Sequence, residues 1–129
     1  MLLRLCYLVL ISMVGVFPSY SESVTHHPEN FLASIGGKPD EGEQIVQHFC
    51  ASCHAVKPLI NLGAPRMGQK ADWLPRVNQG LDLLFKHTAE GHHAMPPRGG
   101  CFECSDAQLK MAIHAMLPPT KSKDNKDNK

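Results

Sequence analysis

Apolar residues recur at steps of three and four between residues 40 and 54, the spacing of one face of an α-helix. This stripe consists of Ile45, Val46, Phe49, Cys50 and Cys53. The acidic pair Asp40-Glu41 stands at its start, where the helix dipole favours negative charge. The pattern predicts a helix from about Pro39 that runs into His54. Gly42 falls on its apolar face, which indicates close approach of another helix.

A second strong helical stripe lies near the end of the chain. It consists of Leu109, Ala112, Ile113, Met116 and Leu117. Ser105 and Gln108 have the spacing of a capping box, and Pro118-Pro119 stops the pattern. We therefore expect a helix that begins after Ser105, with Met111 and Met116 in the core.

Two shorter helices are predicted between these two. Asp72 is placed to cap the first, with Pro75 in its first turn and Trp73, Leu74 and Val77 partly buried. Gly80 interrupts the pattern, and a further helix with Leu81, Leu84 and Phe85 ends near Gly91. Residues 57–68 and 91–101 are loops, and the second has no apolar periodicity. A long loop in so small a domain is typically functional.

The two ends of the chain have other patterns. Arg4, the apolar run Leu5 to Phe17 and Ser19-Tyr20-Ser21 predict an export signal over residues 1–21. The run is shorter than the ~20 residues that span a bilayer, so we expect cleavage, with an uncleaved anchor as the alternative. Residues 22–39 are interpreted as a linker with at most one short helix, from Pro28 to Gly36. Residues 40–119 form the domain, and 120–129 a disordered polar tail.

Composition bounds the class of protein. The chain has 129 residues and a net charge of +1, so one domain is expected and nucleic acid is not expected as a partner. Strand alternation and βαβ patterns are missing, which favours an all-α fold of three to five short helices. Roughly 80 residues in such helices make a thin core that needs a staple.

The motif Cys50-Ala51-Ser52-Cys53-His54 carries the candidate chemistry. Two cysteines three apart with a following histidine are the signature of covalent haem c attachment. Each thiol can form a thioether, and His54 can bind the iron as proximal ligand. A zinc site or a thioredoxin-like redox pair is the alternative, but thioredoxin needs a βαβ unit. A covalent haem would also supply the staple, so one haem c is the predicted cofactor.

The sixth iron ligand is predicted to be Met95. It precedes Pro96-Pro97, which favours extended geometry and stiffens the loop. His92 and His93 lie close enough in sequence to replace it, and His48 precedes the motif. A bis-histidine centre is therefore an open alternative.

Cys101 and Cys104 form a second CxxC pair. A zinc site with Cys50 and Cys53 would need about 15 to 20 residues between the pairs, and Cys53 and Cys101 lie much farther apart. An exported protein favours a local disulfide instead. We expect such a disulfide to fix the turn between the Met95 loop and the last helix.

Taken together, these motifs resemble those of class I c-type cytochromes, and most closely the cytochrome c5 family. The resemblance runs from about Asp40 to Leu117. Its specific parts are the Cys50 to His54 motif, Gly63-Ala64-Pro65, Trp73-Leu74-Pro75-Arg76, the stretch Ala94-Met95-Pro96-Pro97-Arg98-Gly99-Gly100-Cys101, and Cys104-Ser105-Asp106. The adjacent His92-His93 and the charged tail depart from the family pattern.

The resemblance implies a small fold around the haem in which the first and last helices cross. Gly42 and Val46 would lie at this crossing, and we place Ile113 and Met116 opposite them. It also implies that the Pro65 carbonyl accepts a hydrogen bond from His54. A Cys101–Cys104 disulfide is typical of the family. Trp73 and Arg76 would lie near the haem, at a propionate.

The function predicted from these residues is one-electron transfer in the bacterial periplasm through a six-coordinate His54/Met95 haem, not catalysis. Redox proteins such as a membrane cytochrome complex or a terminal oxidase are the expected partners, and proximity to the membrane is left open. Lys57, Arg66, Lys70 and Arg98 form either a basic docking face or scattered solvated charges. The alternative function is a haem c sensor or peroxidase-like protein with a labile or open sixth site. The role of His92 and His93 does not follow from the sequence.

Overall fold

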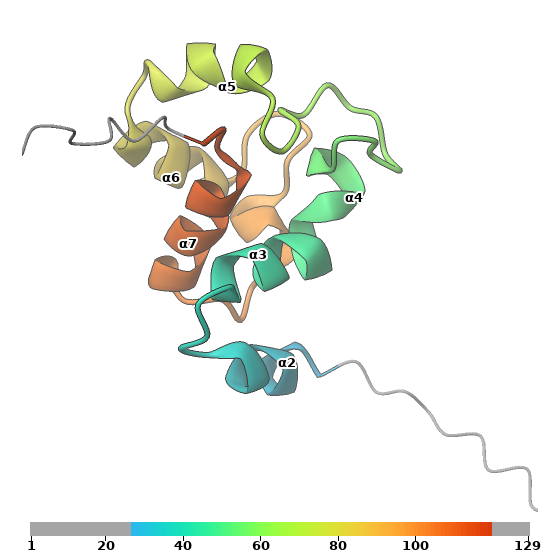
Figure 1. Ribbon diagram of the computed structural model, residues 1–129, viewed down its shortest axis with the longest axis vertical. Coiled ribbons are helices and arrows are strands. Elements are labelled where there is room, and N and C mark those ends of the chain that lie inside the picture. Colours follow the sequence, from blue (N-terminus) through green and yellow to red (C-terminus); the bar gives the residue numbers. More distant parts are fainter. Residues whose placement is uncertain (1–26, 120–129) are drawn as a thin grey trace, which may run out of the picture.

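The computed structural model describes residues 27–119, which form helices joined by loops (Figure 1). The predicted export signal at 1–21 and the predicted polar tail at 120–129 lie outside the described residues. The elements are α2 (Pro28–Ile35), α3 (Glu41–Ile45), the π-helical turn η2 (Val46–Cys50), α4 (Ala51–His54), α5 (Lys70–Val77), α6 (Leu81–Glu90), the 3-10 turn η3 (Pro97–Gly100) and α7 (Asp106–Met116). Within this part of the chain the only β-type pairing is an isolated bridge between His92 and Met95. The all-α prediction is confirmed.

The helix predicted from about Pro39 to His54 is present as α3, η2 and α4, which follow one another without a break. Ile45 and Val46, the start of the predicted apolar stripe, are completely buried. The sequence pattern did not indicate the widened turn, in which the Ala51 N–H donates to the Val46 carbonyl five residues earlier. Such π-turns occur often at functional sites, and this one leads directly into the cysteine motif.

Helices α3 and α7 cross at Gly42, as its position on the apolar face predicted (Figure 1). A Cβ atom on Gly42 would lie 2.6 Å from the Met111 carbonyl oxygen. The atoms nearest Gly42 therefore belong to Met111, and not to Ile113 or Met116 as we had placed them. The prediction that Met111 is a core residue is also wrong, because its backbone faces α3 while its side chain is 37% exposed. Met116 is buried, as predicted.

Helix α2 packs at one end of the molecule, beneath α3 in Figure 1. It begins at Pro28 and ends before Gly36, where the short helix was expected. Its Leu32 and Ile35 are buried in the same cluster as α3 and α7, and the Phe31 ring stacks on the His48 ring with centroids 4.1 Å apart. From Pro28 onward, the segment is therefore packed on the domain.

Helix α5 differs from the prediction at its start. It begins at Lys70, and the Asp72 carboxylate binds Arg66 instead of capping the helix. Pro75 consequently lies inside the helix and not in its first turn. Trp73 is buried, whereas Leu74 is exposed.

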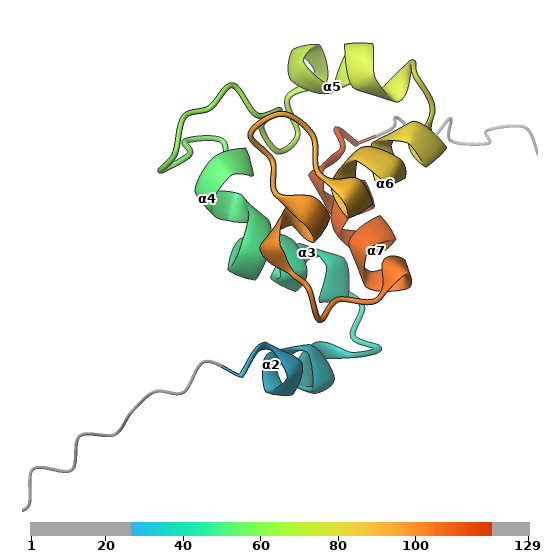
Figure 2. The same ribbon diagram turned by 180° about the vertical axis from the view of Figure 1, so that it is seen from behind.

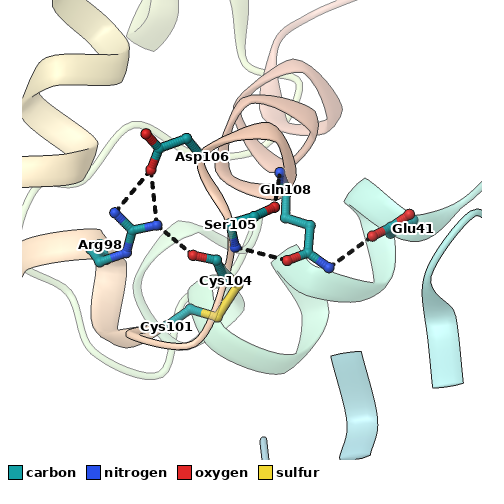
Figure 3. The surroundings of a disulfide bond; sticks show 7 residues. All are labelled: Glu41, Arg98, Cys101, Cys104, Ser105, Asp106 and Gln108. Carbon is teal, nitrogen blue, oxygen red and sulfur yellow. Dashed lines mark hydrogen bonds and ion pairs between the residues drawn. A yellow bond between two sulfur atoms is a disulfide. The ribbon is translucent and has the colours of Figure 1, made fainter. Parts of the chain in front are cut away.

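Helix α6 ends at Glu90, and the following Gly91 has a φ of 87°, which glycine adopts at little cost. Helix α7 begins with the predicted capping box: the Gln108 N–H donates to Ser105 Oγ, and the Ser105 N–H donates to Gln108 Oε1 (Figure 3). Gln108 Nε2 also donates to the buried Glu41 carboxylate at 2.9 Å, which accepts a second bond from the Gly37 N–H. These bonds tie the start of α7 to the start of α3.

Candidate functional site

Two segments distant in sequence converge on one side of the molecule. Figure 2 shows α4, which together with the last residue of η2 carries the cysteine motif, beside the loop that joins α6 to η3 and carries Met95. Contacts between η2 and η3 hold these segments together. The structure therefore brings the two predicted halves of the site to the same place.

The motif cysteines lie on adjacent helical turns. Cys50 and Cys53 are free thiols, and both are partly buried. Burial, followed by the neighbouring Cys53, raises the pKa of the Cys50 thiol to about 11. Cys50 is consequently a neutral thiol at neutral pH in this structure.

His54 is buried, with 7% of its surface exposed, and its orientation is set by the loop that follows. Its Nδ1–H donates to the Pro65 carbonyl oxygen at 2.8 Å. A carbonyl can only accept, so the hydrogen is on Nδ1 and the lone pair on Nε2 is available for a metal. The Met67 N–H donates in turn to the His54 carbonyl at 2.7 Å, which holds the loop against α4.

Trp73 forms a wall beside His54. The two rings are nearly parallel, with centroids 6.4 Å apart. The indole N–H donates to the Arg66 carbonyl at 2.8 Å, and Arg76 Nη1 donates to the Asp72 carbonyl at 2.6 Å. The indole N–H and one nitrogen of the Arg76 side chain are therefore bonded within the protein. The position of Trp73 and Arg76 near a haem propionate stays a prediction.

Arg66 and Asp72 join the loop that precedes α5 to the helix that carries Trp73. Arg66 Nε lies 2.8 Å from Asp72 Oδ2, and the same oxygen accepts the Arg66 backbone N–H. The Arg66 side chain, then its backbone N–H, lowers the pKa of Asp72 from 3.8 to about 2. Arg66 is thus ion-paired and is not one of four free cations on this face.

Met95 lies in a tight turn in the loop between α6 and η3. The His92 and Met95 backbones exchange hydrogen bonds of 3.0 and 2.9 Å. Gly91 packs closely against the backbone of Met95, since a Cβ on Gly91 would lie 2.9 Å from the Met95 carbonyl oxygen. This loop is therefore built by close backbone packing, although the sequence showed only that it is polar and aperiodic.

Gly99 marks the point where the two halves of the site meet. A Cβ on Gly99 would lie 3.4 Å from Met95 Cε and 4.0 Å from Cys50 Sγ. The Met95 side chain therefore extends toward the cysteine motif. Sequence reasoning gave Gly99 no role, and the signal available was the glycine pair Gly99-Gly100 directly after the stiff proline segment.

The histidines considered as alternatives to Met95 make other contacts. The His92 ring stacks on His87 and packs edge-on against His93, with centroids 3.9 and 4.1 Å apart. Desolvation, then the charges of His87 and His93, lowers the pKa of His92. The His48 ring lies between Phe31 and Phe49 at the α2 interface.

Cys101 and Cys104 form a disulfide and are buried (Figure 3). They cannot also serve as zinc ligands. Between residues 27 and 119, no group of three or more histidine, cysteine, aspartate or glutamate side chains could hold a metal ion. This finding does not support the zinc interpretation.

The residues present fit a covalent haem c. Two free thiols on one helical segment, a buried histidine with its Nε2 lone pair available, and a thioether directed toward the same helix are the donors that such a group requires.

Comparisons with known proteins agree on the class of protein. Residues 37–114 match the family described as cytochrome c oxidase, cbb3-type, subunit III. Cytochrome c5 of Azotobacter vinelandii is 41% identical over 83 residues, which are 63% of this chain and 96% of that protein. Cytochrome c5 of Ectopseudomonas mendocina is 38% identical over 86 residues, 65% of this chain and 95% of that one. Cytochrome c-555 of Chlorobaculum tepidum is 36% identical over 84 residues, 62% and 75% of the two chains.

A solved structure is similar as well. It is a chain from the electron transfer complex of nitrite reductase with cytochrome c, with 38% sequence identity and a TM-score of 0.52. The match covers 59% of this chain and 89% of that one. Helix α2 lies before the residues that the family match spans.

Proposed function

Because this chain belongs to the cytochrome c5 family of class I c-type cytochromes, we propose that it is a periplasmic electron carrier whose iron is bound by His54 and Met95. The chain is an electron-carrier cytochrome with a covalently bound haem c, and it is not an enzyme. The haem supplies one-electron chemistry between ferric and ferrous iron. Cys50 and Cys53 are the proposed thioether positions.

His54 is the proposed proximal ligand. The hydrogen bond from its Nδ1 to Pro65 keeps the proton away from Nε2 and fixes the ring plane. The Trp73 ring lies nearly parallel to the His54 ring on one side of it. In this proposal these two contacts prevent the ligand from rotating as the iron changes charge, which keeps reorganisation small.

Met95 is the proposed distal ligand, and one observation carries the assignment. Its Cε and the Cys50 Sγ both lie within 4.0 Å of the position that a Gly99 Cβ would occupy. A thioether so placed can close the second axial position, and His/Met ligation raises the reduction potential. With both positions filled, the iron binds no substrate, which favours electron transfer over a sensor or peroxidase.

The test is the ferric absorption spectrum. Met95 ligation predicts a weak far-red sulfur-to-iron charge-transfer band that disappears in Met95→Ala, with cyanide binding gained. Met116→Ala is the control, since Met116 is buried in α7 and should leave the band in place. Wild-type protein that lacks the band and binds cyanide readily would support the alternative, a sensor or peroxidase-like protein.

Redox proteins are the partners, and we propose a membrane cytochrome complex or a terminal oxidase at a small transient interface. The similar cytochrome c chain was solved with nitrite reductase, which supports a protein partner of this kind. Arg66 and Arg98 are paired with Asp72 and Asp106. A basic docking face would therefore depend on Lys57 and Lys70, which are exposed.

Export is proposed from residues 1–21, with a cytochrome c domain over 40–119 and a polar tail after it. No helix between residues 27 and 119 is long and apolar enough to cross a membrane. Mass spectrometry of the protein purified from the periplasmic fraction should give a chain that starts near Ser21. An intact amino terminus in the membrane fraction would indicate an uncleaved anchor.

A further inference from the structure

The short turn η3 has an unusual backbone where it supports Met95. Arg98 and Gly99 both have positive φ angles, 58° and 60°. Glycine adopts this conformation readily, but for a residue with a Cβ such as arginine it is uncommon and unfavourable. Something outside the turn must therefore stabilise Arg98 in this conformation.

The Arg98 side chain supplies that stabilisation. Its Nη2 donates to the Cys104 carbonyl, and both Nη1 and Nη2 lie 3.1 Å from Asp106 Oδ1 (Figure 3). Cys104 belongs to the disulfide turn, and Asp106 is the first residue of α7. One guanidinium thus joins the Met95 loop to the start of the last helix.

The bond to the Cys104 carbonyl is the stronger of these two arms. The Asp106 side chain is 65% exposed, and an exposed ion pair contributes little. The carbonyl is held by the buried disulfide next to it, so it offers a fixed acceptor. In the described part of the chain the hydrogen bonds of the Arg98 guanidinium are made by Nη1 and Nη2, and Nε is buried without a hydrogen-bond partner.

The turn that Arg98 fixes is the wall behind Met95. The Gly99 N–H donates to the Pro96 carbonyl, and the Cys101 N–H donates to the Arg98 carbonyl. These bonds place the open face of Gly99 against Met95 Cε and near Cys50 Sγ. If Arg98 released Cys104, the turn could relax and the Met95 side chain would lose its support.

We propose that Arg98 is a positioning residue for Met95. Its side chain joins the Met95 loop to the Cys101–Cys104 turn, and we call this connection the latch. The inference rests on the proposed Met95 ligation. The latch determines how often the sulfur leaves the iron, although Arg98 itself binds neither. Lysine could not replace it fully, because a single ammonium cannot present the planar fork that reaches a carbonyl and a carboxylate together.

The experiment compares purified, haem-loaded variants in the ferric state. In Arg98→Ala the far-red band should weaken, and cyanide should bind about 10- to 100-fold faster, the change expected for losing a hydrogen bond from a charged group. Arg98→Lys should fall between this variant and wild type, as a partial rescue. Asp106→Asn should change the rate by less than about threefold, since that arm is exposed.

Arg66→Ala is the matched control. It removes a similar guanidinium–carboxylate pair, Arg66–Asp72, from the loop on the His54 side. Its cyanide rate should stay within about twofold of wild type. An unchanged rate in Arg98→Ala, or an equal rise in Arg66→Ala, would overturn the latch.

The wild-type spectrum separates the two proposals. A band in wild type together with unchanged Arg98 variants leaves Met95 ligation intact and rejects the latch alone. A wild type without the band rejects Met95 ligation and the latch with it. If Arg98→Ala does not fold, the Arg98→Lys rate decides, and a value equal to wild type rejects the latch.

Discussion

At the residue scale, the site consists of side chains whose partners are mostly backbone atoms. His54 is oriented by the Pro65 carbonyl, Trp73 by the Arg66 carbonyl and Arg98 by the Cys104 carbonyl. These backbone acceptors carry no titratable charge. The Arg66–Asp72 and Arg98–Asp106 pairs are different, because their strength depends on the charge of a carboxylate.

Asp72 should make the free energy of unfolding depend on pH in the acid range. Its pKa is about 2 in the folded protein, below the ordinary 3.8, because Arg66 binds the charged form. The stabilisation it gives is therefore complete above about pH 4 and is lost as the pH falls toward 2. Urea unfolding of wild type and Asp72→Asn across this range should give curves that converge at the acid end.

The Arg66→Gln variant provides the check on that assignment. With its partner removed, the carboxyl of Asp72 loses the cause of its shift, and the pH dependence between 4 and 2 should shrink in the same way. Curves for wild type and Asp72→Asn that stay parallel over this range would show that the ion pair has no such role.

At the element scale, the crossing of α3 and α7 is what allows the cysteine motif and the Met95 loop to meet. The crossing is close because Gly42 has no side chain, and the polar chain from Gly37 through Glu41 to Gln108 joins the two helix starts. The disulfide turn then passes from α7 back to η3 (Figure 3). A shift of α7 would therefore move the support of Met95.

Gly42→Ala tests this crossing. The added Cβ would lie 2.6 Å from the Met111 carbonyl oxygen and 2.8 Å from its carbon, which are backbone atoms that cannot rotate away. We expect a loss of about 1 to 3 kcal/mol in the free energy of unfolding, the usual cost of overpacking. Chemical denaturation followed by far-UV circular dichroism measures it.

Gly36→Ala is the control for Gly42→Ala. A Cβ at Gly36 would have only ordinary contacts, at 3.5 Å and beyond, and the φ of this residue is −51°. Its stability should match wild type within about 0.5 kcal/mol. Equal losses in the two variants would mean that the crossing is not unusually tight.

At the scale of the whole molecule, the cysteine motif is followed by an exposed apolar loop. Val56, Leu59, Ile60 and Leu62 are each about half exposed or more, and Leu59 is 91% exposed. Two of the four cations expected on this side are ion-paired. We therefore expect a redox partner to contact apolar side chains near the motif, with a smaller electrostatic contribution than four free cations would give.

Leu59→Asp should lower the rate of electron transfer to a purified terminal oxidase by about tenfold, because an apolar contact is replaced by a charge that must be desolvated. The reduction potential should stay unchanged. Leu81→Asp is the control, since Leu81 is also exposed but starts α6, on the other side of the fold from α4 (Figure 1). Equal rates for wild type and Leu59→Asp would exclude the loop from the interface.

Much of this architecture follows from local patterns. The stripe from Ile45 to Cys53 predicted the helix that leads into the motif, and Ser105 with Gln108 predicted the start of α7, because periodicity and capping act within a few residues. Gly42 predicted a close helix contact. The Cys50 to His54 motif predicted the cofactor, since thioether attachment requires those residue types in that order.

Other features depend on residues that are far apart in the sequence. Asp72 was expected to cap α5, but Arg66 competes for its carboxylate; Met111, and not Ile113 or Met116, lies against Gly42. Gly99 and Arg98 acquire roles only where η3 meets η2 and the disulfide turn. The sequence by itself determined which helices form and which group is bound, because those properties are local. The Pro65 bond to His54 was already expected from the family resemblance. Only the tertiary structure decided what supports Met95 and how Trp73 lies beside His54, because these are contacts made across the folded chain.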